Sequence, residues 1–265
     1  MMLHWFFSIY ALLQGLIIGS FLNVVIDRVP LGAHVRGRSH CDGCGRTLRI
    51  MELVPIFSYI WQRGKSTCCR AKLSLQYPLV ELATGASFAL VTYWYLTGYA
   101  IIIPTRVLSL FGLLIVTASS IAITIIDFRH RIIPDSLQLA LFVGVLIFHL
   151  GMGVLSVDLF GQALIVALPI LILYLVTGGG GMGFGDVKMQ MTLGLWLGLW
   201  QGLLGVYIAF LVGAAYGVML MLLHKANRKS HIAFGPFLLF GAWMMFVWGA
   251  QIMRLAQNIM RMPVQ

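Results

Sequence analysis

The chain has 265 residues, of which 60% are hydrophobic and only 10% are charged, and its mean hydropathy is +0.94. These values exclude a disordered protein and an ordinary soluble domain, in which roughly 25% of residues are charged. The formal net charge of +10 does not indicate nucleic-acid binding, because the basic residues of membrane proteins concentrate in cytoplasmic loops.

Repeated apolar segments predict an all-α, polytopic membrane helical bundle, since about 20 residues cross the hydrocarbon core. The first segment has no basic start and no small-residue cleavage site, so we interpret it as a retained span rather than a signal peptide. The break near Gln201 is short, which leaves one re-entrant hairpin as the alternative for the sixth and seventh segments. The eight predicted helices cover about residues 5–26, 78–98, 106–126, 137–154, 160–177, 187–200, 203–223 and 233–253.

The basic residues indicate how the bundle is oriented. With eight spans, fifteen Lys and Arg residues, Arg228 and Lys229 among them, fall on the same side as the loop 27–77, and three fall on the other side. Because basic loops stay in the cytoplasm, we predict that the loop 27–77 is cytoplasmic and that both termini face outward.

All four cysteines lie in the loop 27–77, which is too small and too polar to form a large core of its own. Cys41 and Cys44 form a CxxC pair, whereas Cys68 and Cys69 are adjacent, and Ser66 stands where a second CxxC would begin. Two CxxC pairs would be a strong signal for tetrahedral zinc. We predict a structural zinc site on the four cysteines; free thiols and a disulfide are the alternatives, and a reducing cytoplasm disfavours the disulfide.

Two acids lie at predicted helix ends on the cytoplasmic side. Asp127 closes the third segment, and Asp186 follows the glycines of GGGGMGFGDVK at residues 178–188. An ionisable group near membrane depth indicates a functional site, and two carboxylates held close together share a proton because both cannot ionise. One could then accept a proton from water while the other activates a carbonyl, as in an aspartic protease. The alternative is a structural acid, with Asp127 paired to Arg129 or Arg131.

Residues near Asp186 also have predicted roles. Gly183 and Gly185 would let a substrate strand approach the backbone closely, since no side chain stands in the way. Lys188 would reach the lipid headgroups or set the charge balance of the site. Asp135 is predicted to be the N-cap of the fourth helix, where a carboxylate accepts backbone N–H groups.

Four stretches in order resemble the type IV prepilin peptidases, which are integral-membrane aspartic proteases. GFGDVK is similar to the G-x-G-D-x-K signature of that family, and DFRHRIIPD to its first aspartate motif. GSFLNVVIDRVP and LSLQYPLVELATG are similar to its motifs on either side of the cysteine loop. The resemblance implies that Asp127 and Asp186 are the catalytic pair of an enzyme in the bacterial inner membrane, surrounded by lipids.

The same resemblance implies the substrate and a second activity. The substrate is a prepilin or pseudopilin with a short basic leader, cut at the cytoplasmic face. Longer members of the family also methylate the new N-terminal amine with S-adenosylmethionine, and this chain has the N-terminal motif and the cysteine loop that mark them. Asn23, Arg28, Glu81 and Gly85 are candidates for that cofactor; Asn23 could instead bridge helices, and Arg28 could instead anchor a span end.

We therefore expect two parts, a methyltransferase part at residues 1–100 and an aspartic peptidase part at residues 101–255. Three alternatives remain at this stage. The chain could be a peptidase without the second activity. It could be a proton or cation transporter that uses the membrane carboxylates, or an assembly protein with an inactive site.

Overall fold

The structure is a computed structural model that describes residues 2–98, 104–225 and 232–261. The described residues form helices and turns without a named strand. The long helices are α1 (Met2–Arg28), α3 (Gln76–Gly98), α4 (Pro104–His130), α5 (Asp135–Met152), α6 (Val157–Thr177), α7 (Phe184–Leu197), α8 (Leu199–Leu222) and α9 (Gly235–Arg261). The loop between α1 and α3 holds the short α2 (Phe57–Trp61) and 3-10 turns at Val29–Leu31 and Ile50–Glu52.

Each of the eight predicted segments is a helix, so the all-α fold is confirmed. Among the described residues, seven helices are long and apolar enough to cross a membrane. Their outer faces carry large apolar side chains, such as Phe6 and Ile17 on α1, that are more than half exposed in the isolated chain. These features make the chain a multi-pass membrane protein.

Helix α7 is the exception, because its 14 residues are fewer than the roughly 20 that cross a bilayer. It is a separate helix from α8, and the chain breaks at Gly198, whose positive φ of 74° suits glycine. An eighth span therefore stays a prediction. Of the basic residues used to orient the bundle, Arg228 and Lys229 lie outside the described residues.

The chain divides into two compact units, and the division falls inside α4 and α5. Unit 1 comprises Met1–Ile125 and Leu146–Gly153, and unit 2 comprises Ile126–Val145 and Val154–Gln265. These bounds describe packing alone, so the predicted functional parts at 1–100 and 101–255 stay predictions.

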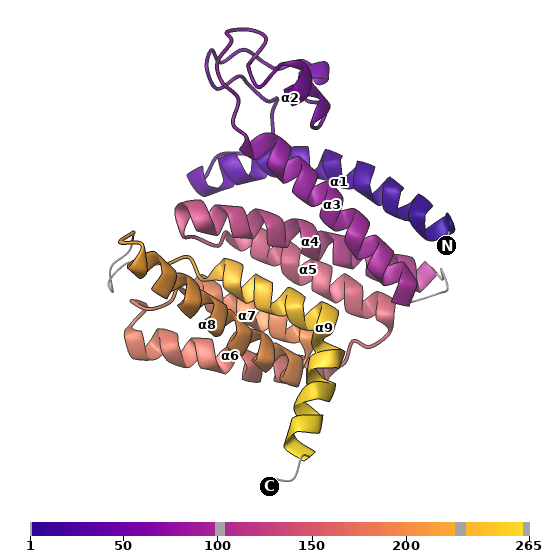
Figure 1. Ribbon diagram of the computed structural model, residues 1–265, viewed down its shortest axis with the longest axis vertical. Helices are drawn as coiled ribbons and strands as arrows, with labels where there is room; N and C mark the ends of the chain where they lie inside the picture. The colour runs from indigo at the N-terminus through magenta and orange to yellow at the C-terminus, as the bar shows by residue number, and fades with distance from the viewer. Residues whose placement is uncertain (1, 99–103, 226–231, 262–265) are drawn as a thin grey trace. The chain divides into compact units, whose positions relative to one another are not determined.

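In unit 1, α1 and α3 lie side by side, and the loop that holds α2 stands at the end where they connect (Figure 1). Small residues recur on α1 at four-residue spacing, at Ala11, Gly15 and Gly19, and all three are buried. A Cβ atom added to Gly15 would lie 2.8 Å from the Cα of Gly85, and one added to Gly19 would lie 2.7 Å from the Cα of Glu81. The two backbones therefore meet along a small-residue face, as is common between membrane helices.

In unit 2, α6 packs on α7 and α8 packs on α9. The α8–α9 contact is close enough that a Cβ atom added to Gly241 would overlap the carbonyl oxygen of Gly205. Helix α7 begins at Phe184 and α9 at Gly235, and both starts belong to the site described below.

We predict that Gly15→Ala destabilises the protein, because the added methyl group has no space between α1 and α3. Overpacking of this kind costs about 1–3 kcal/mol. The matched control is Gly161→Ala on α6, where an added Cβ meets nothing within 4 Å. Helix propensity should make that variant neutral or up to roughly 1 kcal/mol more stable. Thermal unfolding in detergent measures both, and equal midpoints for the two variants would contradict the close contact.

Candidate functional sites

Asp127 lies in the last turn of α4, and its side chain is only 4% exposed. Its Oδ2 accepts the N–H of Gly235, the first residue of α9, at 2.9 Å. The first N–H groups of a helix have no partner within the helix, so this carboxylate satisfies one of them and lies at the positive end of the helix dipole. In the described part of the chain, Asp127 makes no ion pair with Arg129 or Arg131, the structural alternative.

Asp186 lies in the first turn of α7 and is 8% exposed. Its Oδ2 accepts the N–H of Gly183, the N-cap residue, at 3.1 Å. Its Oδ1 is buried and makes no hydrogen bond within the described chain. A buried carboxylate oxygen without a partner is costly, so this atom is placed to hold a proton or to bind a water molecule.

The structure brings both acids to one cavity of ≈ 700 Å³ in unit 2. Ile133, in the α4–α5 connection, packs close to the backbone beside both acids. A Cβ added to Gly185, next to Asp186, would lie 3.4 Å from Ile133 Cβ. A Cβ added to Gly235, the partner of Asp127, would lie 3.2 Å from Ile133 Cδ1. A cavity of this size admits a segment of peptide, since ligand pockets measure roughly 300–1,000 Å³.

The glycines before Asp186 line the same cavity, as do Gly183 and Gly185 themselves. Helix α6 ends at Gly178, which has a left-handed conformation with φ of 58°, and Gly179 follows with φ of 81°. These two residues reverse the chain between α6 and α7, a conformation that residues with a side chain rarely adopt. The remaining glycines contribute only backbone to a wall that also carries side chains such as Met182 and Phe184. Their role in substrate approach stays a prediction.

Lys188 donates to Asp135 Oδ1 at 2.8 Å and lies over the ring of Phe184, 5.4 Å from its centroid. Lys188 and Asp135 both line the cavity. The prediction that Asp135 is an N-cap is wrong by one position. The carbonyl of Pro134 accepts the N–H groups of Leu137 and Gln138, so Asp135 is already in the helix and its side chain is available to Lys188.

The sulfur atoms of Cys41, Cys44, Cys68 and Cys69 all lie within 4.8 Å of one another. Tetrahedral zinc with Zn–S bonds of about 2.3 Å separates its sulfurs by about 3.8 Å, so the cluster fits such an ion closely. The pKa of the Cys41 thiol is lowered to about 6, first because of its contact with the Ser66 hydroxyl, whereas the contact with Cys68 raises the pKa of the Cys44 thiol. The four cysteines could therefore hold a metal ion.

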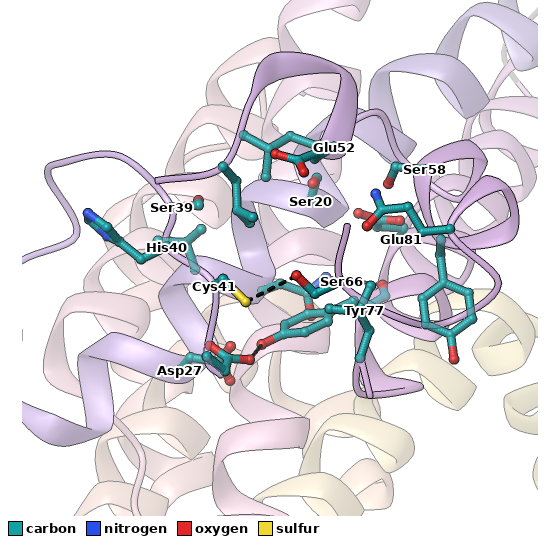
Figure 2. A pocket seen from close by; sticks show the side chains of 18 of the residues that line it. Ser20, Asp27, Ser39, His40, Cys41, Glu52, Ser58, Ser66, Tyr77 and Glu81 are labelled. Atoms are coloured by element: carbon teal, nitrogen blue, oxygen red, sulfur yellow. Dashed lines mark hydrogen bonds between the residues drawn. The ribbon is translucent and has the colours of Figure 1, made fainter. Parts of the chain in front are cut away.

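Unit 1 has a cavity of ≈ 320 Å³ between the ends of α1 and α3 and the cysteine loop. Figure 2 shows Asp27, Glu52 and Glu81 around it, with Cys41 and Ser66 in its wall. Tyr77 donates to Asp42, another lining residue, at 2.9 Å. Four of the eight acids of this basic chain thus line one small cavity, and only Arg28 and His40 line it as basic residues. Such a lining favours a cationic ligand.

Three of the four residues predicted to bind the cofactor line this cavity. Glu81 accepts the N–H of Ile56 at 2.7 Å, and Asn23 donates to the carbonyls of Gly19 and Tyr77, so Asn23 bridges α1 and α3. Arg28 donates to four carbonyl groups of the following loop, those of His34, Val35, Arg36 and Arg38. Gly85 does not line the cavity; it lies in the α1–α3 contact, where an added Cβ would meet Leu16.

Sequence reasoning missed Gly235 and Ile133, because the residues that support Asp127 lie far from it along the chain. A Cβ on Gly235 would lie 2.8 Å from Asp127 Oδ2, so glycine is required there by close approach. The Gly-Pro pair at 235 and 236 was the available signal, since proline in the first turn is typical of a helix start.

Comparison of the sequence with known proteins shows the family of this chain. Residues 13–95 match the bacterial peptidase A24 N-terminal domain, and residues 113–218 match the type IV leader peptidase family. A relative from Stutzerimonas stutzeri is 35% identical over 93% of this chain and 92% of its own length. The chain belongs to the type IV leader peptidase family.

Other relatives agree. Proteins from Aeromonas hydrophila and Pseudomonas aeruginosa are each 34% identical, over 95% and 94% of this chain and 94% and 92% of their own lengths. All three carry the name prepilin leader peptidase/N-methyltransferase. Asp127 and Asp186 fall in the segment that matches the leader peptidases, and the four cysteines fall in the N-terminal segment. No solved structure matches the chain.

We predict that Lys188→Ala lowers stability only slightly, although the residue lies beside Asp186 in sequence. The side chains of Lys188 and Asp135 are 45% and 78% exposed, and exposed ion pairs contribute about 0.2–1 kcal/mol. Thermal unfolding of Lys188→Ala, of Asp135→Ala and of the double variant measures the coupling free energy of the ion pair. A coupling well above that range would show that the pair is structural.

Proposed function

We propose that this enzyme removes the leader peptide from prepilins or type II secretion pseudopilins and methylates the new N-terminal residue. The names of its full-length relatives support both activities. The observation that carries the first activity is the burial of Asp127 and Asp186 in one cavity, with one oxygen of Asp186 left without a partner.

In the proposed cleavage, a water molecule attacks the carbonyl carbon of the scissile bond. One carboxylate accepts the proton of the water, and the other, in its acid form, donates a proton to the carbonyl oxygen. The tetrahedral intermediate then expels the amine of the mature protein, which takes up a proton. The N–H groups of Gly235 and Gly183 hold one oxygen of each acid, so the remaining oxygens can face the water.

The glycine segment 178–185 is proposed as the surface along which the substrate backbone lies. The bare wall at Gly183 and Gly185 permits close approach of an extended strand. Lys188 and Asp135 at the same cavity would contact charges of the substrate on either side of the scissile bond.

The methylation is proposed for the acidic cavity of unit 1, and we assign it to residues 1–100, with the peptidase at 101–255. S-adenosylmethionine supplies an electrophilic methyl group on a positively charged sulfur. When bound, this cofactor would supply that methyl group to the amine of the mature protein, and a carboxylate of the cavity lining would accept the proton that the amine releases. Asp27, Asp42, Glu52 and Glu81 would attract the cationic donor and amine, with Asn23 and Arg28 ordering the walls.

The cysteine cluster is proposed as a structural zinc site beside this cavity, which Cys41 lines. Its sulfur separations and four-thiol composition support the assignment. We further propose that the enzyme lies in the bacterial inner membrane with the loop 27–77 in the cytoplasm, because basic residues concentrate in that loop.

We predict that Asp127→Asn and Asp186→Asn each reduce leader removal by roughly 10²–10⁴-fold, the usual contribution of a general acid or base. Co-expression with a prepilin, followed by a gel-shift assay, measures the loss. The matched control is Asp158→Asn, because Asp158 is the one acid that lines neither cavity and is exposed. Normal processing by either single variant would contradict the catalytic pair, and no processing by the intact chain would favour a transporter.

We predict that Asp27→Asn lowers methylation without stopping cleavage. Losing one charged contact of about 1.5–3 kcal/mol should reduce the methylated fraction roughly ten- to a hundredfold under limiting cofactor. Mass spectrometry of the mature N-terminus, with and without S-adenosylmethionine, separates the two steps. Asp158→Asn again serves as the control. Equal loss of both activities would instead indicate misfolding, and unchanged methylation would place the cofactor elsewhere.

A further inference from the structure

The cysteine loop contains two turns with the same backbone geometry. The first knuckle, residues 40–47, is closed by a bridge between His40 and Thr47, and the second knuckle, residues 65–72, by one between Lys65 and Lys72. Within the first, Cys41 N–H donates to Arg46 and Gly45 N–H donates back to Cys41. These two bonds define the turn from which CxxC cysteines present their sulfurs.

The second knuckle repeats both bonds at the equivalent positions. Ser66 N–H donates to Ala71 at 2.8 Å, and Arg70 N–H donates to Ser66 at 2.9 Å. Arg70 also repeats the left-handed conformation of Gly45, with φ of 56° against 71°. The two turns therefore correspond position by position in their backbone hydrogen bonds.

This register shows which residue occupies each ligand position. Cys44 corresponds to Cys69, the second ligand of its turn. Cys41 corresponds to Ser66, so the first ligand position of the second knuckle has a hydroxyl instead of a thiol. Cys68 corresponds to Gly43, a position that carries no side chain in the first knuckle.

The side chains at these positions nevertheless converge. The sulfur of Cys68 lies 3.1 Å from that of Cys44, and the sulfur of Cys69 lies 3.6 Å from that of Cys41. The Ser66 hydroxyl is 3.1 Å from Cys41 Sγ and 2.9 Å from Cys68 Sγ, and Ser66 is 3% exposed. Ser66 thus contacts two of the four sulfurs.

Gly43 shows why the extra cysteine belongs to only one knuckle. A Cβ added to Gly43 would lie 2.7 Å from Ala71 Cβ and 3.0 Å from Cys69 Sγ. The first knuckle therefore has no room for a side chain at its third position, whereas the second knuckle carries Cys68 there.

We infer that Cys68, from the third position of its knuckle, supplies the fourth thiolate of the metal site, and that Ser66 binds the sulfurs rather than the metal. A thiolate is a softer and more strongly charged ligand for zinc than a neutral hydroxyl. The Ser66 O–H then donates to one of the two adjacent thiolates and reduces the charge concentrated on the site. This inference rests on the proposed zinc site.

Cobalt substitution tests the assignment on the purified full-length chain in detergent, because the thiolate-to-cobalt absorption grows with the number of thiolate ligands. We expect one cobalt per chain with four-thiolate absorption. Cys68→Ser should reduce the absorption to that of three thiolates and speed metal release to a chelator at least tenfold. Ser66→Ala should keep the four-thiolate absorption while weakening metal affinity roughly 10–100-fold, as loss of an outer hydrogen bond does.

A double variant provides the matched control. Ser66→Cys with Cys68→Gly recreates the first knuckle's pattern in the second, and it should restore four-thiolate absorption. Unchanged absorption in Cys68→Ser, or altered absorption in Ser66→Ala, would overturn the inference while leaving a metal site in place. A wild-type chain that binds no metal would overturn both the zinc site and the inference. Circular dichroism and gel filtration confirm that each variant keeps its helices.

Discussion

Two backbone N–H groups hold the buried carboxylates of unit 2, and the arrangement of the site depends on them. A charged group removed from water must find partners in the protein, or its burial costs several kcal/mol. Asp127 finds its partner at the start of α9, and Asp186 finds its partner at the start of α7. Each carboxylate also lies at the positive end of a helix dipole. The positions of these two helix starts are therefore part of the chemistry as well as of the packing.

The glycines around the two acids are also needed for this arrangement. A side chain at Gly235 would occupy the space of the Asp127 carboxylate, and one at Gly185 would press on Ile133. Glycine at these positions allows two helix starts and a loop to converge on one cavity. The same glycines contribute only backbone to the cavity wall, which is the feature on which the proposed approach of an extended substrate rests.

The distribution of acids divides the chemistry of the chain between its two units. Four acids line the cavity of unit 1, three line that of unit 2, and only Asp158 lies apart. In a chain of net charge +10, this grouping creates two places that favour protons or cations. One cavity has buried carboxylates suited to proton transfer, and the other has a polar, partly open lining suited to a cationic methyl donor. The cysteine loop lines the cavity of unit 1, so the proposed structural zinc site would stabilise part of the wall of that cavity.

Particular residues show what sequence patterns could and could not predict. Apolar runs predicted every long helix, because burial in lipid depends on composition and length alone. The motifs around Asp127 and Asp186 predicted the two acids, and the CxxC spacing predicted a metal cluster in which Ser66 was the irregular position. The N-cap at Asp135 was wrong by one residue, because the exact start of a helix depends on its backbone hydrogen bonds. Gly85 packs against α1 and does not line the cavity, so its role toward the cofactor stays a prediction.

The sequence by itself determined the membrane helices, the family motifs and the candidate acids and thiols, because each is encoded by local composition and spacing. Only the tertiary structure decided that Gly235 supports Asp127, that four acids share one cavity and that Cys68 lies where its thiol can replace that of the missing cysteine. Those relations join residues that are distant along the chain, and they arise from close helix packing and backbone hydrogen bonds that no local pattern records.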